Sequence, residues 1–312
     1  MSLSTRHFFD RIQNSSLTKF RLPSPPYYDP SYWDRAYKDA TPDDCIEWGG
    51  FDLNRLLKFR WERISLDEFG FASNDVAEEK EGTSTFAEWL DIQQHESPEE
   101  ASSAYQQRKL SNDSSNDAIL LLGCGNSKMG EQLLIHSFQG PFLQLDVSSK
   151  LIQCMTQRYD KYLKEAAVKR MEFIVDDATE LTSLEPNSVG GAVIDKGLFD
   201  GLHCALPNVN LEIDDGKDSI RKIMESVHRV LQPSRPFVFF SRSSPKYMLR
   251  RSFGDDYEIE ERRRRWKDVS VIKLVDLDVM LYRFVKAEEN NEDVNLRVTT
   301  RAFRMKKRPK RN

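Results

Sequence analysis

Residues 119–127 read Ile119-Leu120-Leu121-Leu122-Gly123-Cys124-Gly125-Asn126-Ser127. Together with Ala118, the apolar residues 119–122 have the length and composition of a strand that is buried on both faces of a parallel sheet. The two glycines that follow allow a sharp backbone turn and a close approach to a ligand. Such a turn is weak evidence alone, so its meaning depends on the chain around it.

Strands and helices alternate on the carboxyl-terminal side of this turn. Apolar runs predict further strands at 142–146, 171–175, 189–195, 236–241 and 278–286. Apolar residues at helical spacing predict helices at about 127–138, at 149–163, and from an Asp218 cap up to Pro233. This alternation predicts an α/β fold, a doubly wound and mostly parallel sheet with right-handed crossovers.

Acidic residues stand where the predicted strands end. Asp146 closes the second strand, 23 residues after Gly123, which is about where an acid holds a ribose hydroxyl in nucleoside-binding sheets. Asp177 follows the third strand, and Asp195 ends the fourth. Because ligands bind at the carboxyl ends of parallel strands, these acids and the glycine turn are expected to meet at one edge. Each acid could instead cap the helix that follows it.

The ligand expected at that edge is S-adenosyl-L-methionine. A dinucleotide fold needs a third glycine at position 128, where this chain has Lys128, so a pyrophosphate cradle is weakly supported. A ligand with an adenosine and no phosphate needs only the first turn, the ribose acid and an adenine pocket. Asp177 and Ala178 can supply a side-chain acceptor and a backbone N–H for the adenine.

The motifs resemble those of the seven-strand methyltransferases. Gly123-Cys124-Gly125-Asn126-Ser127 is typical of the methyltransferase-like branch that methylates lysines of translation elongation factor 1-alpha. The run 193–200, which reads VIDKGLFD, is similar to the Lys-Gly-Thr-Leu-Asp signature of that branch, with Leu198 in place of the threonine. The lead-in at Tyr32-Trp33-Asp34-Arg35-Ala36-Tyr37 and Glu47-Trp48 also resembles it. The resemblance covers roughly residues 27–61 and 118–286, and it implies a seven-stranded sheet.

The resemblance also implies a set of site residues. Three aromatic residues would close over the cofactor, whose sulfonium cation is attracted by aromatic faces, and seven others would complete its site. The aromatic residues are Trp33, Tyr37 and Trp48, and the others are Gly123, Gly125, Asp146, Val147, Asp177, Ala178 and Lys196. Core packing is the alternative role for the aromatics, and an ion pair with Asp195 is the alternative for Lys196. Asp200 is the candidate catalytic residue, a proton acceptor for the lysine amine, with helix capping as the alternative.

Charge and composition divide the chain into regions. The methyltransferase domain is expected at 27–286, interrupted by an acidic insertion at 62–117 that has the polar composition of a segment with little core. Residues 85–90 form a helical island, which packs on its own domain or docks a partner. Residues 1–26 are a disordered lead-in or a transit peptide, and residues 287–312 form a basic tail.

Composition limits the partners and the metal chemistry. The formal net charge of −4 argues against a dedicated nucleic-acid binder, although the basic tail could make a weak contact with nucleic acid. No apolar run is long enough to span a membrane. The four cysteines are far apart, and the five histidines are scattered without a ligand pattern, so no metal site is expected.

The leading hypothesis is a cytoplasmic protein-lysine methyltransferase with a protein substrate. Alternatives are a mitochondrial enzyme of the citrate-synthase type, a small-molecule methyltransferase, and a non-catalytic scaffold that keeps the fold. The mitochondrial matrix and the nucleus are the alternative locations. The sequence does not indicate the oligomeric state.

Overall fold

The computed structural model describes residues 29–47, 50–66, 80–110, 117–162, 170–204, 215–253 and 265–288. The lead-in at 1–26, Trp48 and residues 289–312 of the basic tail lie outside these ranges, as do parts of the acidic insertion. Among the described residues, no helix has both the length and the apolar character needed to cross a membrane.

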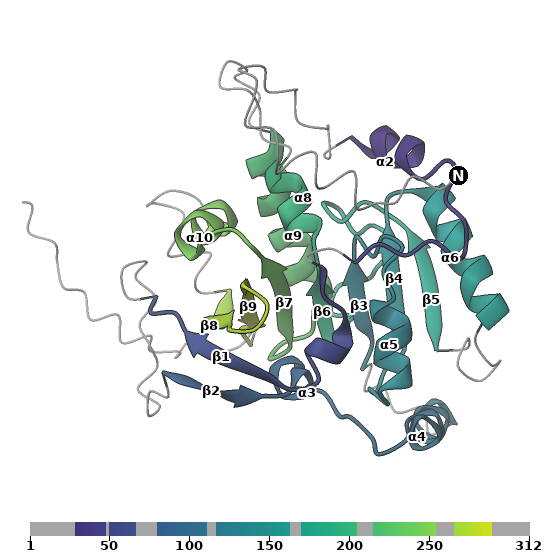
Figure 1. The fold of residues 1–312 in the computed structure, drawn as a ribbon, viewed down its shortest axis with the longest axis horizontal. Helices are drawn as coiled ribbons and strands as arrows, with labels where there is room; N and C mark the ends of the chain where they lie inside the picture. Colours follow the sequence, from purple (N-terminus) through teal and green to yellow (C-terminus); the bar gives the residue numbers. More distant parts are fainter. Residues whose placement is uncertain are drawn as a thin grey trace, which may run out of the picture.

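One sheet organises these residues (Figure 1). Its strands are β1 (Phe59–Arg63), β2 (Glu81–Ser84), β3 (Ile119–Leu122), β4 (Phe142–Asp146), β5 (Met171–Val175), β6 (Ala192–Asp195), β7 (Pro236–Ser241), β8 (Trp266–Leu274) and β9 (Val279–Lys286). They lie in the order β2-β1-β8-β9-β7-β6-β3-β4-β5. Strands β3 to β7 pair in parallel, and the remaining strands join them through antiparallel pairs. The doubly wound, mostly parallel α/β sheet predicted from the sequence is therefore confirmed.

The predicted number of strands was wrong, because the described residues form nine strands rather than seven. Strands β1, β2 and β8 have no counterpart among the strand ranges predicted from the sequence. Strands β1 and β2 pair with each other and extend the sheet beyond β8. Phe59 and Trp61 of β1 point into the core, while Arg60 and Glu62 are exposed. Gly82 of β2 lies against the Trp61 indole, where an added Cβ would come within 2.7 Å of a ring carbon. The acidic insertion thus contains part of the folded domain.

Helices cover both faces of the sheet (Figure 1). They are α2 (Pro30–Ala36), the 3-10 helix η2 (Leu53–Arg55), α3 (Phe86–Leu90), α4 (Pro98–Leu110), α5 (Met129–Ile135), α6 (Ser149–Tyr162), α8 (Leu198–Cys204), α9 (Asp215–Val230) and α10 (Pro245–Phe253). One hydrophobic cluster joins η2, α3, α5 and α6 to the sheet, and a second joins α8, α9 and α10 to its other face. Helix α9 starts at Asp215, three residues before the predicted cap.

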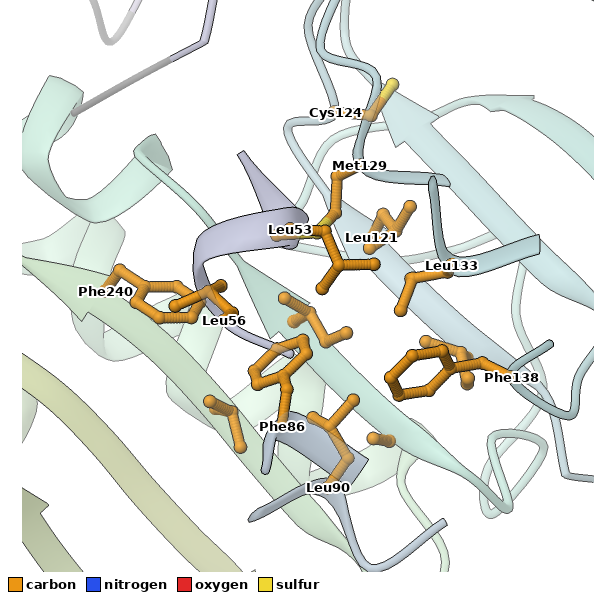
Figure 2. Close-up of a cluster of buried hydrophobic side chains, with 14 of the residues drawn as sticks. Leu53, Leu56, Phe86, Leu90, Leu121, Cys124, Met129, Leu133, Phe138 and Phe240 are labelled. Carbon is orange, nitrogen blue, oxygen red and sulfur yellow. The ribbon is translucent and has the colours of Figure 1, made fainter. Parts of the chain in front are cut away.

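The helical island at 85–90 belongs to its own domain. Thr85 accepts a hydrogen bond from the backbone of Glu88 and completes a capping box, as the sequence predicts. Phe86 and Leu90 of α3 are fully buried. Figure 2 shows them packed in the same cluster as Leu53 and Phe138. This packing favours the structural alternative over a helix that docks a partner.

Candidate functional site

The turn after β3 and the end of β4 meet at one edge of the sheet. Gly123 and Gly125 have φ angles of +53° and +54°, in the left-handed region that favours glycine. Asp146 is the last residue of β4 and is only 7% exposed. Its Oδ2 accepts a hydrogen bond from the Gly125 N–H at 3.1 Å, and its Oδ1 accepts one from the Ser148 N–H at 3.0 Å. The structure thus brings together the two sequence features on which the ligand prediction depended.

The environment of Asp146 shifts the pKa of its carboxyl group. Burial raises its pKa from 3.8 to about 6, while hydrogen bonds from three backbone N–H groups act in the opposite direction. The charge of Asp34 adds a smaller increase. A buried carboxyl held in a fixed orientation by backbone donors is suited to binding a polar ligand group at a defined point.

A segment far upstream in sequence crosses over this edge. We call residues 29–57 the strap; it contains α2 and η2, and its residues 48 and 49 lie outside the described ranges. Near its start, the Asp34 Oδ1 accepts a hydrogen bond from the Ser148 Oγ at 2.8 Å. In its middle, the Ile46 N–H donates to Asn126 Oδ1 at 3.1 Å.

Two of the three predicted aromatic residues lie on the strap within the described ranges. The rings of Trp33 and Tyr37 stack, with centroids 5.9 Å apart and planes 21° apart. The Tyr37 hydroxyl lies against Gly125, since an added Cβ there would meet it at 3.4 Å. Burial, with a contribution from the charge of Asp146, raises the pKa of Tyr37 well above its usual value of 10. Tyr37 therefore lies over the glycine turn, and its closing over a cofactor stays a prediction.

Lys196, at the end of β6, points at the strap. Its Nζ forms an ion pair with the Glu47 carboxylate and donates a hydrogen bond to the Phe51 carbonyl oxygen at 3.0 Å. The same Glu47 carboxylate accepts hydrogen bonds from the Ser127 Oγ at 2.8 Å and from the Lys128 N–H at 2.7 Å. Sequence reasoning noted Glu47 only beside Trp48 and gave it no role. Its partner is 149 residues away, and no local spacing rule relates the two.

The loop after β5 is hydrogen-bonded to the end of β4 through the backbone. The Asp176 N–H donates to the Asp146 carbonyl oxygen at 3.2 Å. The Asp176 carboxylate is engaged by Ser183, which makes it a turn-capping residue. The Asp177 Oδ1 accepts from the Thr179 N–H and Oγ1, both at 2.8 Å. Asp177 thus caps a turn as well. Its predicted hydrogen bond with the adenine amino group would have to use the other carboxylate oxygen, Oδ2, and it stays a prediction.

The two remaining predicted residues of these strand ends differ in accessibility. Ala178 is 8% exposed, and its carbonyl oxygen accepts a hydrogen bond from the Ser226 Oγ of α9 at 2.6 Å. Val147 is half-buried directly after Asp146. Val175, the last residue of β5, is 51% exposed and supplies an apolar surface beside these ends.

Asp195 holds the start of α8 in place. It is fully buried, and it accepts hydrogen bonds from the N–H groups of Gly197, Leu198 and Phe199 at 2.8, 2.6 and 2.9 Å. Burial raises its pKa from 3.8 to about 7, the nearby charge of Asp200 adds to this increase, and the three N–H donors oppose it. The structure therefore supports the helix-capping alternative for Asp195 and gives Lys196 a different ion-pair partner.

The raised pKa of Asp195 predicts how stability depends on pH. Because the folded carboxyl holds its proton more tightly than the unfolded one, the folded chain binds more protons between about pH 4 and 7, so stability falls as pH rises through that range. Asp195→Asn removes this titration, so we expect a smaller loss of unfolding free energy between pH 5 and 8 than in the unmodified protein. Urea denaturation at pH 5 and at pH 8 measures this change in the free energy of unfolding.

Asp276→Asn is the matched control, because the exposed Asp276 has a pKa lowered by hydrogen bonding to Arg60 and titrates below this window. Equal pH dependence in Asp195→Asn and in the unmodified protein would show that Asp195 is already ionised throughout the range.

Asp200, the candidate catalytic residue, lies on α8 and reaches the end of β7. Its Oδ1 accepts a hydrogen bond from the Ser241 Oγ, and its Oδ2 accepts one from the Arg242 N–H at 3.1 Å. The side chain is 6% exposed. Beneath this turn, the Tyr282 hydroxyl donates to the Ser243 carbonyl oxygen at 3.1 Å. Asp200 therefore shares the carboxyl edge with the other predicted residues, with β6 and β3 between the end of β7 and Asp146.

The residues at this edge fit an adenosine-containing ligand. Gly125 has a φ of +54°, which a residue with a side chain adopts only with strain, and each oxygen of the buried Asp146 carboxylate accepts one backbone hydrogen bond and has capacity for another. In the part of the chain that the structure describes, no cluster of three His, Cys, Asp or Glu side chains could hold a metal ion. Cys124 is buried, and burial raises the pKa of its thiol well above 9, so it is suited to packing rather than to nucleophilic attack.

Comparisons with curated proteins confirm the expected resemblance. The chain is 25% identical over 142 residues to EEF1A lysine methyltransferase 4 of Mus musculus, a match that covers 46% of this chain and 52% of that protein. It is 33% identical over 125 residues to the eEF1A lysine and N-terminal methyltransferase of Xenopus laevis, which covers 40% of this chain and 16% of that protein. The chain thus spans about half the length of the first relative. No protein-family model matches the sequence.

Two solved structures show a distant similarity. TrmN from Thermus thermophilus superimposes with a TM-score of 0.36 at 12% identity, covering 59% of this chain and 48% of that one. A TehB-like SAM-dependent methyltransferase from Corynebacterium glutamicum gives a TM-score of 0.35 at 12% identity, covering 61% of this chain and 97% of that one.

Proposed function

We propose that this chain is an S-adenosylmethionine-dependent methyltransferase that acts on a protein lysine, with a substrate of the elongation factor 1-alpha type. The observation that carries the proposal is the hydrogen bond from the Gly125 N–H to Asp146 at the carboxyl edge, under the aromatic residues of the strap. The names of the curated relatives support the substrate class.

Each residue at the edge has a proposed role in holding the cofactor. Asp146 would accept hydrogen bonds from the ribose hydroxyls, and Gly123 and Gly125 would let the backbone approach the ligand. Trp33 and Tyr37 would cover it from the strap side, and Asp177 would accept a hydrogen bond from the adenine amino group through Oδ2. The bound cofactor supplies an electrophilic methyl group on a sulfonium centre.

The chemistry required of the protein at the acceptor is mainly orientation and removal of a proton. A lysine side chain has an ordinary pKa near 10.4, so only about one in a thousand is neutral at pH 7.4. A neutral amine is needed because its lone pair attacks. Asp200, fixed by Ser241 and Arg242, would orient the amine and accept its proton at the carboxyl end of β7.

The role of Asp200 predicts a selective loss of turnover. We expect Asp200→Asn to lower kcat by about 100-fold, the lower end of what general acid–base groups contribute, and to change cofactor affinity less than two-fold. Ser241→Ala is the control, because it removes the hydroxyl that holds Asp200 but keeps the carboxylate. If Ser241→Ala slows turnover as much as Asp200→Asn does, Asp200 acts by holding the end of β7 and not as a proton acceptor.

Transfer of a radiolabelled methyl group in cell extract tests the proposed function. The purified protein and its Asp146→Ala variant are each incubated with labelled S-adenosylmethionine and extract, and the products are separated by size and by acid hydrolysis. The proposal predicts a labelled protein band that yields methyl-lysine and is absent with the variant. Label confined to the small-molecule fraction would indicate a small-molecule methyltransferase, and no label above background would indicate a non-catalytic scaffold.

A further inference from the structure

The Glu47–Lys196 ion pair differs from the other ion pairs of the strap. The side chains of Lys196 and Glu47 are 6% and 18% exposed. In the pair of Lys38 with Asp39 these values are 70% and 87%, and in the pair of Lys161 with Asp43 they are 58% and 68%. Exposed pairs contribute little to stability, whereas breaking a buried pair leaves a charge without a partner in a poorly solvated place.

The Glu47 carboxylate joins the strap to two other elements. It holds the end of β6 through Lys196, and it holds the start of α5 through Ser127 and Lys128. The Lys196 ammonium is further held by the Phe51 carbonyl oxygen and lies 5.3 Å from the centre of the Phe51 ring. Glu47 therefore fastens the strap to the loops after β3 and β6 through a buried charge, in addition to the hydrogen bonds that Asp34 and Ile46 make with Ser148 and Asn126.

The two ends of the strap are held differently. Leu53 and Leu56 are fully buried, and Figure 2 shows Leu53 beside Met129 and Leu121 in the core. Helix α2, at the other end, buries none of its residues completely. A movement of the strap would therefore leave residues 51–57 in place and lift residues 29–47, with Glu47 at the boundary.

The strap covers the turn where the ligand is proposed to bind. A small cavity of about 20 Å³ lies on the core side of this turn, bordered by Gly123, Cys124, Ser127 and Lys196, and its lining includes neither Asp146 nor Tyr37. Tyr37 lies directly over Gly125, so the strap stands between solvent and the turn that is proposed to receive the ligand.

We infer that Glu47 is a positioning residue whose ion pair with Lys196 latches residues 29–47 over the site, so that this latch sets how fast the cofactor enters and leaves. The inference rests on the proposed function for the identity of the ligand, but the latch itself can be observed without ligand. Loss of the Glu47 charge leaves Lys196 buried without its partner and frees the segment to lift.

The first test is amide hydrogen exchange on the full chain without ligand. We expect Glu47→Gln to make the amides of residues 29–47 exchange about ten-fold faster, while those of β7 are unchanged. Asp39→Asn, on the same segment but with an exposed side chain, is the matched control and should exchange like the unmodified protein. Equal exchange of residues 29–47 in Glu47→Gln and in the unmodified protein would overturn the latch.

The second test follows release of S-adenosylhomocysteine by stopped-flow competition. We expect release to be about ten-fold faster from Glu47→Gln, with KM for the methyl donor raised by a similar factor and kcat changed less than two-fold. Release from the Glu47→Gln, Lys196→Met double variant should be no faster than from Lys196→Met alone, because both substitutions break one interaction. Additive effects, or release from Glu47→Gln at the original rate, would contradict the inference.

The two tests separate the failure of the latch from the failure of the proposed function. If the unmodified protein binds no S-adenosylhomocysteine, the proposed function is wrong, and hydrogen exchange still decides whether Glu47 holds the strap. If it binds the compound but Glu47→Gln changes neither exchange nor release, the function stands and the latch is wrong.

Discussion

Asp146→Ala is expected to weaken S-adenosylhomocysteine binding by at least 100-fold. The carboxylate would hold the ribose hydroxyls, and hydrogen bonds to a charged group are each worth about 1.5–3 kcal/mol, so losing them reaches the roughly 2.7 kcal/mol that a 100-fold change represents. The substitution also removes the acceptor for the Gly125 and Ser148 N–H groups and so loosens the turn that approaches the ligand. Isothermal titration calorimetry measures the loss.

Asp146→Asn is the matched comparison. It keeps the shape of the side chain and one acceptor oxygen, so we expect a weakening between those of the unmodified protein and the alanine variant. Circular dichroism on each variant separates a loss of binding from a loss of structure. Binding of the ligand to folded Asp146→Ala within three-fold of the original affinity would remove Asp146 from the site.

Phe239→Ala is expected to lower the free energy of unfolding by about 3–5 kcal/mol, the usual cost of deleting a buried aromatic ring. Phe239 is fully buried in β7. Its ring stacks on Tyr282 with centroids 4.4 Å apart and packs on Phe199 at 4.7 Å. These contacts join the sheet to α8, so the same substitution should also disturb the position of Asp200.

Urea denaturation measures the effect of Phe239→Ala. Val275→Ala is the control, because Val275 is 37% exposed in the turn between β8 and β9 and should change stability by about 0.5 kcal/mol or less. A loss below about 1 kcal/mol for Phe239→Ala would mean that the aromatic cluster around it is less well packed than the structure describes.

The parallel strands and β9 could be predicted from sequence because each is a short, mostly apolar run. The predicted bounds of β4, β5 and β7 match the structure, and those of β3 and β9 differ by one residue. Strand β6 is shorter than predicted, since Val189 forms only an isolated bridge with Leu231. Buried strands exclude polar residues on both faces, and this leaves a pattern that single-sequence reasoning detects.

The edge strands could not be predicted in the same way. In β1 only Phe59 and Trp61 are buried, and the alternate positions are charged or exposed. In β2 the residues facing the core include Gly82, whose small size matters only because the Trp61 indole lies against it. Such strands are stabilised by contacts with residues that are distant in sequence, and their own composition resembles that of a polar loop.

The part of the candidate site that is encoded in local sequence motifs could be predicted. The turn at Gly123 and Gly125 and the acid Asp146 were identified by spacing, and the structure places them in direct contact. The Glu47–Lys196 pair joins positions far apart in sequence, and the position of one residue gives no information about the other. Trp48 lies outside the described residues, so its place over the cofactor stays a prediction.

A crystal structure of the protein with S-adenosylhomocysteine decides where the ligand binds. We expect density for the ligand at the carboxyl ends of β3, β4 and β5, with the ribose hydroxyls hydrogen-bonded to Asp146 and the strap closed over it. Ligand density at any other surface, with Asp146 making only its bonds to Gly125 and Ser148, would contradict it.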